Sequence, residues 1–203
     1  MSDEQKAHEL ISIFSCSKDS DVENFLKNRA IVFEKMGKSR TFLIFDEDKE
    51  DFKLLAYFTL ALQVLKIPES FSNRRIKQLD GFNAKIHGER ILEFPALLIG
   101  QLAKNDLYRD CMSGYELVQY CLSTLLDGQI RLGGRIVMLE CKDIPYLISF
   151  YKQFGFAKLE KDYKEGDLIQ LIKILREEEI IELPGEVDQG SGEENNPNEG
   201  EFK

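Results

Sequence analysis

The chain has 203 residues, of which 43% are apolar, which is enough for one compact domain with a sizeable core. Residues 177–203 carry ten acidic residues and one basic residue, which equals the whole formal net charge of −9, so residues 1–176 are neutral overall. This distribution argues against a protein that binds nucleic acid through a large excess of positive charge. We expect a single folded domain over residues 1–176 and a separate acidic tail over residues 177–203.

The tail is rich in Gly, Pro, Asn and Glu and poor in large apolar side chains. Such a composition buries too little apolar surface to offset the entropy of ordering the chain, and it predicts disorder. A solubilising tail and an acidic attachment segment for a basic partner both fit this composition.

The N-terminus is polar and acidic and does not have the basic flank and long apolar run of a signal peptide. No apolar run reaches the length of a membrane span, so we expect a soluble, cytoplasmic protein that has no contact with a membrane. The four cysteines are widely spaced with no C-x-x-C pair, and the two histidines, His8 and His87, are far apart. We therefore expect reduced thiols and no metal site.

The first half of the domain predicts a helix followed by two strands. Ser20 precedes Glu23 at the spacing of a capping box, apolar residues then recur at helical spacing, and Gly37 can close the helix in a left-handed conformation. The runs "RTFLIF" (40–45) and "LLAYFTLAL" (54–62) are typical of neighbouring antiparallel strands.

Residues 66–95 mix turn residues with a basic cluster of Arg74, Arg75 and Lys77. This segment fits a short solvated helix with a loop, and it also fits a site that meets an anionic group. The run "ALLIGQLAK" (96–104) that follows is continuously apolar, which favours a strand buried on both faces. Beyond it, one apolar stripe at helical spacing predicts a helix; its residues are Leu117, Val118, Cys121, Leu122, Leu125 and Leu126.

The last third predicts strand, helix, strand, strand. "GGRIVMLECK" suits the centre of a sheet, and "DLIQLIKIL" supplies the last strand. Between them, Asp143 or a neighbour can cap a helix that has Pro145 in its first turn and Gly155 just past its end. The order of elements predicts an α/β fold in which one mixed sheet is covered by helices.

Four segments together resemble the GNAT N-acetyltransferase family, in the branch that includes tRNA-acetylating toxins and related unassigned acetyltransferases. The segments are "FSCSKDSDVENFLKNRA", "SRTFLIFDEDKEDFKLLAYFTLAL", "FPALLIGQLAKNDLYRDCMSG" and "IVMLECKDIPYLISFYKQFGF". The phrase "FYKQFGF" is the most specific of them, and the resemblance extends from about Ile13 to Leu175. It implies the GNAT acyl-CoA N-acyltransferase fold as a single domain.

The resemblance also implies a site for acetyl-CoA as co-substrate. In GNAT enzymes two neighbouring strands splay apart, and the gap between them admits the pantetheine arm, which hydrogen-bonds to the backbone of the first strand. The corresponding strands here are residues 99–103 and 137–141, and the corresponding backbone groups are those near Leu102 and Ala103. The loop that follows surrounds the pyrophosphate with amides at a helix N-terminus, where the helix dipole favours an anion. The corresponding residues here are Arg109, Asp110, Cys111, Met112, Ser113 and Gly114.

The loop departs from the family pattern. Aligned on Tyr108, the usual R-Y-Q-G-x-G-x-G reads L-Y-R-D-C-M-S-G, so Asp110 and Met112 replace glycines and Gly114 remains. Glycine at such positions permits positive φ and close approach of the backbone to phosphate. The Asp110 carboxylate would repel a pyrophosphate about 5 Å away by roughly 1 to 3 kcal/mol, and Arg109 would offset part of that repulsion.

By family position, Tyr151 is the catalytic residue, a general acid for the departing thiolate. A buried aromatic of the core is the alternative role for this side chain. The strand at 96–104 contains no carboxylate for a general base, and Glu140 on the neighbouring strand is a weaker candidate for that role.

The resulting hypothesis is an acetyl-CoA-dependent N-acetyltransferase that acts on a primary amine of a small molecule, a protein or an aminoacyl-tRNA. The alternative is a GNAT-fold binding or regulatory protein that has weakened or lost acetyl-CoA binding. A tRNA partner requires a basic surface, which Arg74, Arg75, Lys77, Arg131 and Arg135 would have to form together. A homodimer is compatible with the sequence.

Overall fold

A computed structural model describes residues 3–46 and 53–175 of the chain, so the predicted acidic tail lies outside the described residues. A six-stranded sheet runs through the molecule in the order β1-β2-β5-β6-β8-β7. Neighbouring strands are antiparallel except β5 and β6, which pair in parallel. The predicted mixed α/β fold with one layer of sheet is confirmed.

Three short helices precede the sheet: α1 (Asp3–Ser12), α2 (Ser20–Asn28) and α3 (Ala30–Lys35). The helix α1 was not predicted, and the single helix predicted over 20–37 was wrong, because the chain leaves helical geometry at Arg29. The predicted capping box was also wrong: the Asp19 side chain caps α2, and Glu23 instead accepts a hydrogen bond from the Cys16 amide at 2.8 Å. Gly37 ends α3 with a φ of +65°, as predicted.

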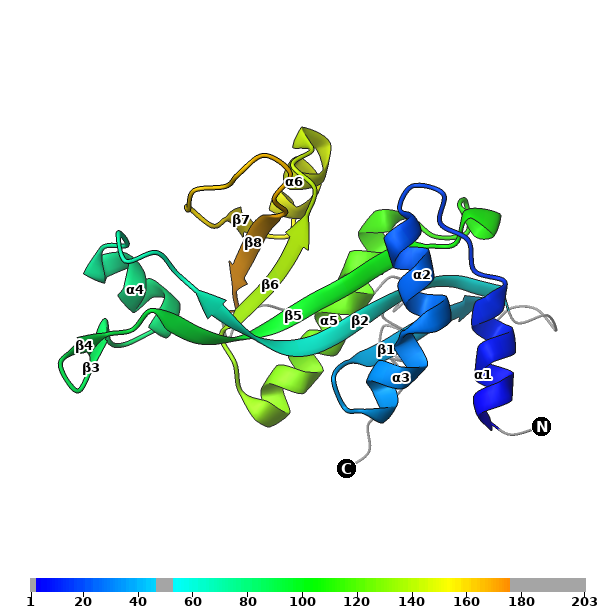
Figure 1. Ribbon diagram of the computed structural model, residues 1–203, viewed down its shortest axis with the longest axis horizontal. Helices are drawn as coiled ribbons and strands as arrows, with labels where there is room; N and C mark the ends of the chain where they lie inside the picture. Colours follow the sequence, from blue (N-terminus) through cyan, green and yellow to red (C-terminus); the bar gives the residue numbers. More distant parts are fainter. Residues whose placement is uncertain (1–2, 47–52, 176–203) are drawn as a thin grey trace, which may run out of the picture.

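The strands β1 (Arg40–Asp46) and β2 (Lys53–Lys66) form the predicted antiparallel pair. On its other edge β2 pairs with β5 (Glu93–Lys104) almost along its whole length. The two strands make a long ribbon that extends beyond the rest of the sheet (Figure 1). The prediction that β5 is buried on both faces is confirmed for its middle part, where Ala96, Leu97 and Ile99 are buried. It does not extend to Gly100, which is exposed.

Residues 67–92 form a small lobe at the far end of this ribbon (Figure 1). It contains α4 (Asn73–Asp80) and a hairpin of β3 (Lys85–Ile86) and β4 (Glu89–Arg90), with His87 and Gly88 at positive φ in its two-residue turn. The apolar side chains of the lobe, which include Phe71, Ile76 and Leu79, belong to a core that they share with Ile136 and Met138 of the sheet.

After β5, a 3-10 turn (Asp106–Tyr108) leads to α5 (Gly114–Leu132), β6 (Ile136–Cys141), α6 (Pro145–Lys152), β7 (Ala157–Lys158) and β8 (Ile169–Ile174). The prediction that Asp143 or a neighbouring side chain caps α6 was wrong, because Ile144 is the N-cap and none of the described side chains bonds to the first turn. Pro145 at the first helical position and Gly155 at a φ of +82° were predicted correctly.

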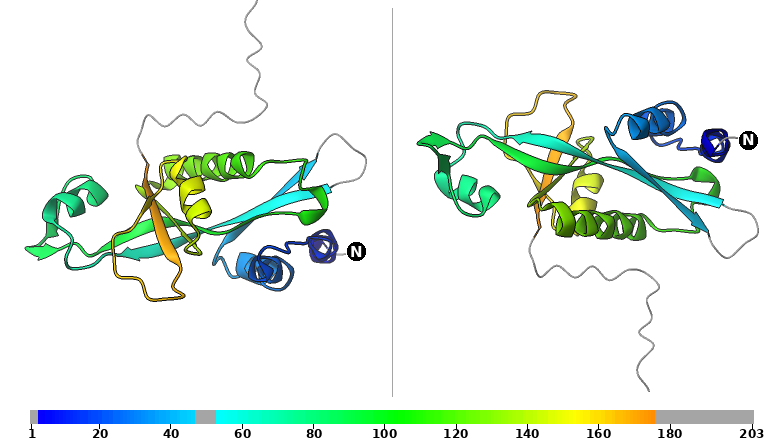
Figure 2. Two further views of the ribbon diagram at one scale, coloured as in Figure 1. Left: turned by 90° about the horizontal axis from the view of Figure 1, so that it is seen from above. Right: turned by 90° about the horizontal axis from the view of Figure 1, so that it is seen from below.

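The helices lie on both faces of the sheet. The helices α1, α2 and α3 cover one face and α5 covers the other (Figure 2). The main core, which contains Val118, Leu122 and Val137, lies between α5 and the sheet, and side chains of α6 pack against it. A second core under α2 contains Phe14, Leu26 and Tyr57.

None of the helices in the described part of the chain is long and apolar enough to span a membrane. The four cysteines are unpaired, with Cys16, Cys121 and Cys141 buried and Cys111 exposed.

Candidate active site

The central feature of the site is the separation of β5 from β6. Their parallel pairing begins at Ala96 with Ile136 and ends at Ile99 with Leu139, although β5 continues to Lys104 and β6 to Cys141. The two strands therefore diverge toward their C-terminal ends (Figure 1). The predicted positions Leu102 and Ala103 lie in the diverging part of β5, where β2 borders one edge of the strand and β6 no longer pairs with the other.

A β-bulge at Gly100 coincides with the start of this divergence. On β2, Thr59 pairs with Gln101 and Leu60 with Ile99, so Gly100 has no opposite residue. A Cβ atom at Gly100 would lie 3.0 Å from the Thr59 hydroxyl oxygen, which explains the glycine at this position. Because a bulge bends its strand, it helps to turn the end of β5 away from β6.

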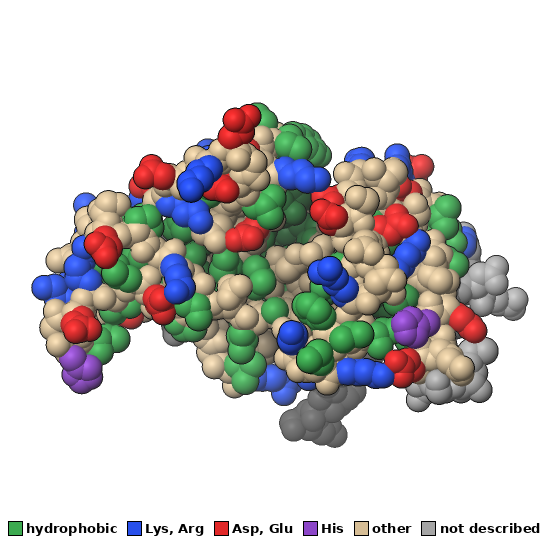
Figure 3. All heavy atoms as spheres, in the orientation of Figure 1, with side chains coloured by type: hydrophobic (Ala, Val, Ile, Leu, Met, Phe, Trp, Pro, Cys, Tyr) green, Lys and Arg blue, Asp and Glu red, His purple; other side chains and the backbone are tan. Residues whose placement is uncertain are grey.

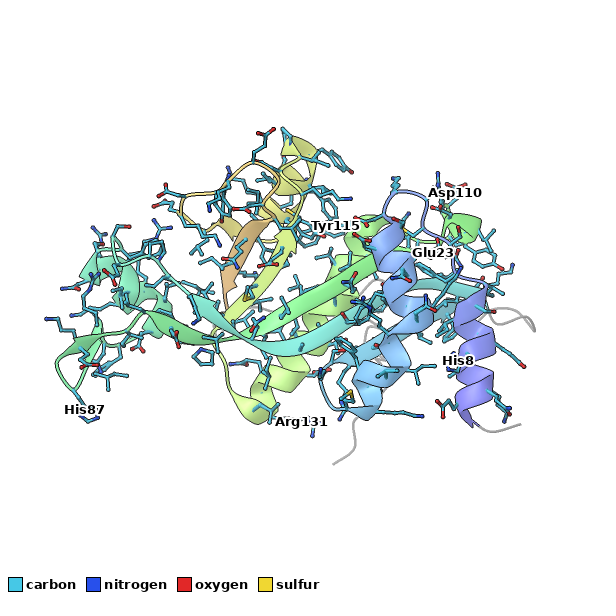
Figure 4. The ribbon with its side chains drawn as sticks, viewed as in Figure 1. His8, Glu23, His87, Asp110, Tyr115 and Arg131 are labelled. Atoms are coloured by element: carbon cyan, nitrogen blue, oxygen red, sulfur yellow. The ribbon has the colours of Figure 1, made fainter. Side chains whose placement is uncertain are left out.

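A space-filling view shows a recess between the α6 side of the molecule and the α2 side, with hydrophobic side chains on its floor (Figure 3). At the α5 end, the Tyr115 ring lies 4.7 Å from that of Phe154, and a Cβ atom at Gly114 would lie 3.5 Å from the Phe150 ring. Figure 4 shows Tyr115 in the space between the two halves of the sheet. Tyr115 was not among the predicted site residues, although its place at the start of a helix beside the loop was a usable signal.

One ion pair crosses this recess. The Lys142 ammonium, just after β6, lies 2.8 Å from a carboxylate oxygen of Asp19, the N-cap of α2. The hydrogen bond with Lys142 lowers the pKa of Asp19, and the same bond raises the pKa of Lys142. The pair joins the two halves of the molecule. The Lys142 side chain is 54% exposed and that of Asp19 31% exposed, and a salt bridge between such exposed groups contributes little to stability.

Lys104, the last residue of β5, holds the loop between β5 and α5 through hydrogen bonds. Its ammonium donates to the carbonyl oxygens of Arg109 at 2.8 Å and Met112 at 2.6 Å. Of the described residues, none accepts a hydrogen bond from the Asp110 or Met112 amide. The Arg109 and Met112 carbonyls thus bind the Lys104 ammonium, and the Asp110 and Met112 amides remain available to another partner.

The replaced glycines do not force the loop into a strained conformation. Among the described residues, His87 is the only non-glycine residue with positive φ, so Asp110 and Met112 do not require the left-handed region. The Met112 side chain is 8% exposed and packs into the main core, whereas Asp110 and Cys111 are exposed. Figure 4 shows Asp110 at the outer edge of the molecule.

The Arg109 side chain binds the segment that precedes α2. Its guanidinium donates to Asp106 Oδ1 at 2.8 and 3.0 Å and to the Ser17 hydroxyl at 3.0 Å. The other Asp106 oxygen accepts the Ser17 amide at 2.6 Å. The bonds from Ser17, together with Arg109, lower the pKa of Asp106 to about 2. Arg109 therefore connects the loop to the α1–α2 connection.

A capping box closes the N-terminus of α5. The Ser113 amide donates to Glu116 Oε2 at 2.6 Å, and the Glu116 amide donates to the Ser113 hydroxyl at 3.1 Å. The bond from the Ser113 amide lowers the pKa of Glu116. A carboxylate of the chain thus occupies one of the amides that were predicted to bind pyrophosphate.

Tyr151 lies on α6 against Phe150 and Phe156, at ring-centre distances of 5.3 and 6.0 Å. Burial, together with the nearby thiols of Cys141 and Cys121, raises the pKa of Tyr151 to about 12. The phenol therefore keeps its proton at neutral pH. It packs against the main core beside the end of β6, where that strand diverges from β5.

Glu140 is exposed, and its carboxylate accepts a hydrogen bond from the Gln170 amide group at 2.7 Å. Its neighbours on β6, Leu139 and Cys141, point into the main core with Tyr151. Because successive side chains of a strand point to opposite faces, Glu140 lies on the other face of the sheet.

The five basic residues considered for a tRNA surface are only partly gathered. Arg74 and Lys77 line a hollow on α4, and the Arg135 side chain contacts Gly81 at the end of that helix. Arg75 forms an ion pair with Glu160. Figure 4 shows the fifth residue, Arg131, at the far end of α5, away from the lobe.

Comparison with protein families finds no family model that matches the chain, and comparison with curated proteins finds no match. Solved structures do match. A tyrosine-to-phenylalanine variant of KacT is 18% identical with a TM-score of 0.60, over 81% of this chain and 86% of that chain. AtaT in complex with acetyl-methionyl-tRNAfMet is 17% identical with a TM-score of 0.59, over 78% of this chain and 85% of that chain.

The AtaTR structure bound with AcCoA is 19% identical to this chain with a TM-score of 0.58, over 79% of this chain and 84% of that chain. At these identities the likeness concerns the fold. The predicted GNAT fold is therefore confirmed: the chain shares the mixed α/β architecture of the AtaT and KacT structures over 78 to 81% of its length.

Proposed function

We propose that the chain is an acetyl-CoA-dependent N-acetyltransferase that acts on a primary amine. The observation that carries the proposal is the end of β5–β6 pairing at Ile99 and Leu139, with the Gly100 bulge beside it. Within the described residues, no strand pairs with the β6-facing edge of β5 at Leu102 and Ala103, and backbone groups there can bind the amide groups of a pantetheine arm.

The loop fits a phosphate group in part. The Asp110 and Met112 amides have no partner among the described residues, and they lie next to the positive end of the α5 dipole. Arg109, by contrast, is engaged by Asp106 and Ser17. The Asp110 and Met112 amides would therefore hold the pyrophosphate, and Arg109 would keep the loop attached to the α1–α2 connection.

Acetyl-CoA would supply an activated acetyl group as a thioester. Tyr151 would act as the general acid that protonates the thiolate leaving group, because a phenol with a pKa of about 12 keeps its proton at neutral pH until the C–S bond of the thioester breaks. The recess crossed by Asp19 and Lys142 would admit the amine from the α2 side.

A thiol-release assay with acetyl-CoA and a panel of amines, small molecules first and then aminoacyl-tRNA, tests the proposal. We expect Tyr151→Phe to lower kcat by a factor of about 10² to 10⁴ with little change in acetyl-CoA affinity. The matched control is Tyr146→Phe, on the same helix but 74% exposed. Equal kcat in Tyr151→Phe and the control would remove the role of Tyr151.

The acceptor is a separate question. Because structures of this fold include AtaT with acetyl-methionyl-tRNAfMet, aminoacyl-tRNA belongs on the panel. Arg74 and Lys77 on α4 supply basic groups for such a partner. Expression in a cell-free translation extract with acetyl-CoA tests this acceptor, and undiminished translation would exclude it.

A second candidate function is a GNAT-fold binding or regulatory module without tight acetyl-CoA binding. It is favoured by the engagement of Arg109 with Asp106 and of the Ser113 amide with Glu116. Calorimetry with acetyl-CoA separates the two functions: a micromolar Kd supports the enzyme, and no binding at millimolar acetyl-CoA supports the module.

A further inference from the structure

The anion-binding end of α5 already contains an anion that belongs to the chain. Glu116 Oε2 accepts the Ser113 amide at 2.6 Å, within the loop that leads into the helix. This is a short, charge-assisted hydrogen bond. The carboxylate therefore takes a place at the positive end of the helix dipole that a phosphate group also favours.

The surrounding charges hold this arrangement in place. Lys104, the last residue of β5, binds the carbonyls of Arg109 and Met112, and its positive charge adds to the effect of the Ser113 bonds in lowering the pKa of Glu116. The Arg109 guanidinium is turned to Asp106 and Ser17. Both side chains are thus engaged in internal contacts, and a second anion placed next to Glu116 would have to share the Lys104 charge that already acts on this carboxylate.

We propose that Glu116 competes with the pyrophosphate of acetyl-CoA for the N-terminus of α5. This inference rests on the proposed function, since it assigns a residue that sets the affinity of the same site. For the loop to bind pyrophosphate through the Ser113 amide, the Glu116 carboxylate has to leave that amide, and the two anions repel each other while both are near. The competition acts on the phosphate end of the co-substrate and leaves the pantetheine end unaffected.

A purely structural cap is the alternative role for Glu116, and the chemistry of the capping box separates the two roles. Glutamine at this position retains the capping bond, because its amide oxygen also accepts from the N-cap amide. Glu116→Gln therefore keeps the helix cap and removes the negative charge. A role in capping alone leaves acetyl-CoA affinity unchanged by this substitution, whereas competition increases it.

The experiment measures the Kd of acetyl-CoA and of acetyl-pantetheine by calorimetry for the full chain and for Glu116→Gln. We expect Glu116→Gln to bind acetyl-CoA on the order of tenfold more tightly, which corresponds to about 1.4 kcal/mol, and to bind acetyl-pantetheine, which carries no phosphate, with unchanged affinity. The control is Glu89→Gln, which removes the same charge from the hairpin of the lobe at the opposite end of the molecule (Figure 1).

The outcomes are distinct. Equal acetyl-CoA affinity in the wild type and Glu116→Gln overturns the competition and leaves the proposed function standing. An equal gain in Glu89→Gln shows a general effect of charge and also overturns it. The absence of acetyl-CoA binding in all three proteins overturns the proposed function and this inference with it. A gain confined to Glu116→Gln and to acetyl-CoA supports the competition.

Discussion

Lys104 is the residue whose removal should most directly loosen the loop before α5. Its ammonium donates two hydrogen bonds, to the carbonyls of Arg109 and Met112, at 2.8 and 2.6 Å. Lys104→Met retains most of the apolar stem of the side chain but removes both bonds. The carbonyls then have to find water or change direction, so we expect the loop to lose its orientation.

The size of the effect follows from the two bonds. A hydrogen bond to a charged group contributes about 1.5 to 3 kcal/mol when it is well shielded from water. Lys104 is half-buried, so solvent screening reduces each bond to the lower end of that range or below. Part of the loss is recovered by hydration of the freed carbonyls, and we expect the free energy of unfolding to fall by about 2 kcal/mol.

Urea unfolding followed by circular dichroism measures this change. With an m-value of about 2 kcal/mol per M, the midpoint should fall by about 1 M. The control is Lys66→Met, because the Lys66 ammonium is exposed and its ion pair with Glu93 contributes little. A midpoint for Lys104→Met within about 0.2 M of the control would refute the argument that these two bonds hold the loop.

Two glycines and one aspartate give further predictions. Gly100→Ala should lower the free energy of unfolding by about 1 kcal/mol, because the new methyl group would lie 3.0 Å from the buried Thr59 hydroxyl. Gly128→Ala, within α5 with open space around it, should raise it by about 0.5 to 1 kcal/mol. The folded-state pKa of Asp106 is lowered to about 2, so the Asp106 carboxylate stabilises the fold above about pH 4 and this stabilisation is lost as the pH falls toward 2. Asp106→Asn removes the carboxylate and should therefore reduce the drop in Tm between about pH 4 and pH 2.

Each of these predictions has a contrary result. A urea midpoint for Gly100→Ala that is no lower than that of the wild type would show that the Gly100 bulge tolerates a side chain, and a midpoint for Gly128→Ala that is no higher would contradict the prediction for α5. An unchanged acid-induced drop in Tm for Asp106→Asn would show that other carboxylates determine acid stability. A matched variant for this measurement is Asp167→Asn, which changes an exposed carboxylate in the loop before β8.

The strands and the long helix were predictable because their patterns are local. The runs at 40–45 and 54–62 and the stripe of α5 each repeat at the period of one structure, and the structure has those elements. The helix α1 was missed because a short polar segment has little apolar periodicity, and its burial at Ile11 depends on contacts with residues far along the chain.

Choices between neighbouring residues were harder to predict. Ser20 and Asp19 both suit an N-cap, and the sequence alone did not show that Glu23 would be taken by the Cys16 amide. The break at Arg29 was hidden because the apolar period continues through it. Such decisions depend on differences of about 1 kcal/mol that tertiary contacts settle.

The loop shows the same limit at the candidate site. Counting glycines suggested a conformational problem at Asp110 and Met112, but the backbone avoids positive φ there and Met112 packs into the core. The pairing of Arg109 with Ser17 joins residues 92 positions apart, and that of Lys142 with Asp19 joins residues 123 positions apart. Local patterns carry no information about contacts at that separation.

The short parallel contact between β5 and β6 has a mechanical consequence. The two halves of the sheet are hydrogen-bonded to each other over Ala96–Ile99 and Ile136–Leu139, and at the open end they meet through side chains such as Asp19 and Lys142. The paired segments Ala96–Ile99 and Ile136–Leu139 therefore form the pivot between the two halves of the sheet, and the unpaired ends of β5 and β6 at the recess are its two tips. A small rotation at the pivot becomes a larger displacement at the tips, so a change of side-chain volume at Leu97 or Met138 would alter the width of the recess without touching it.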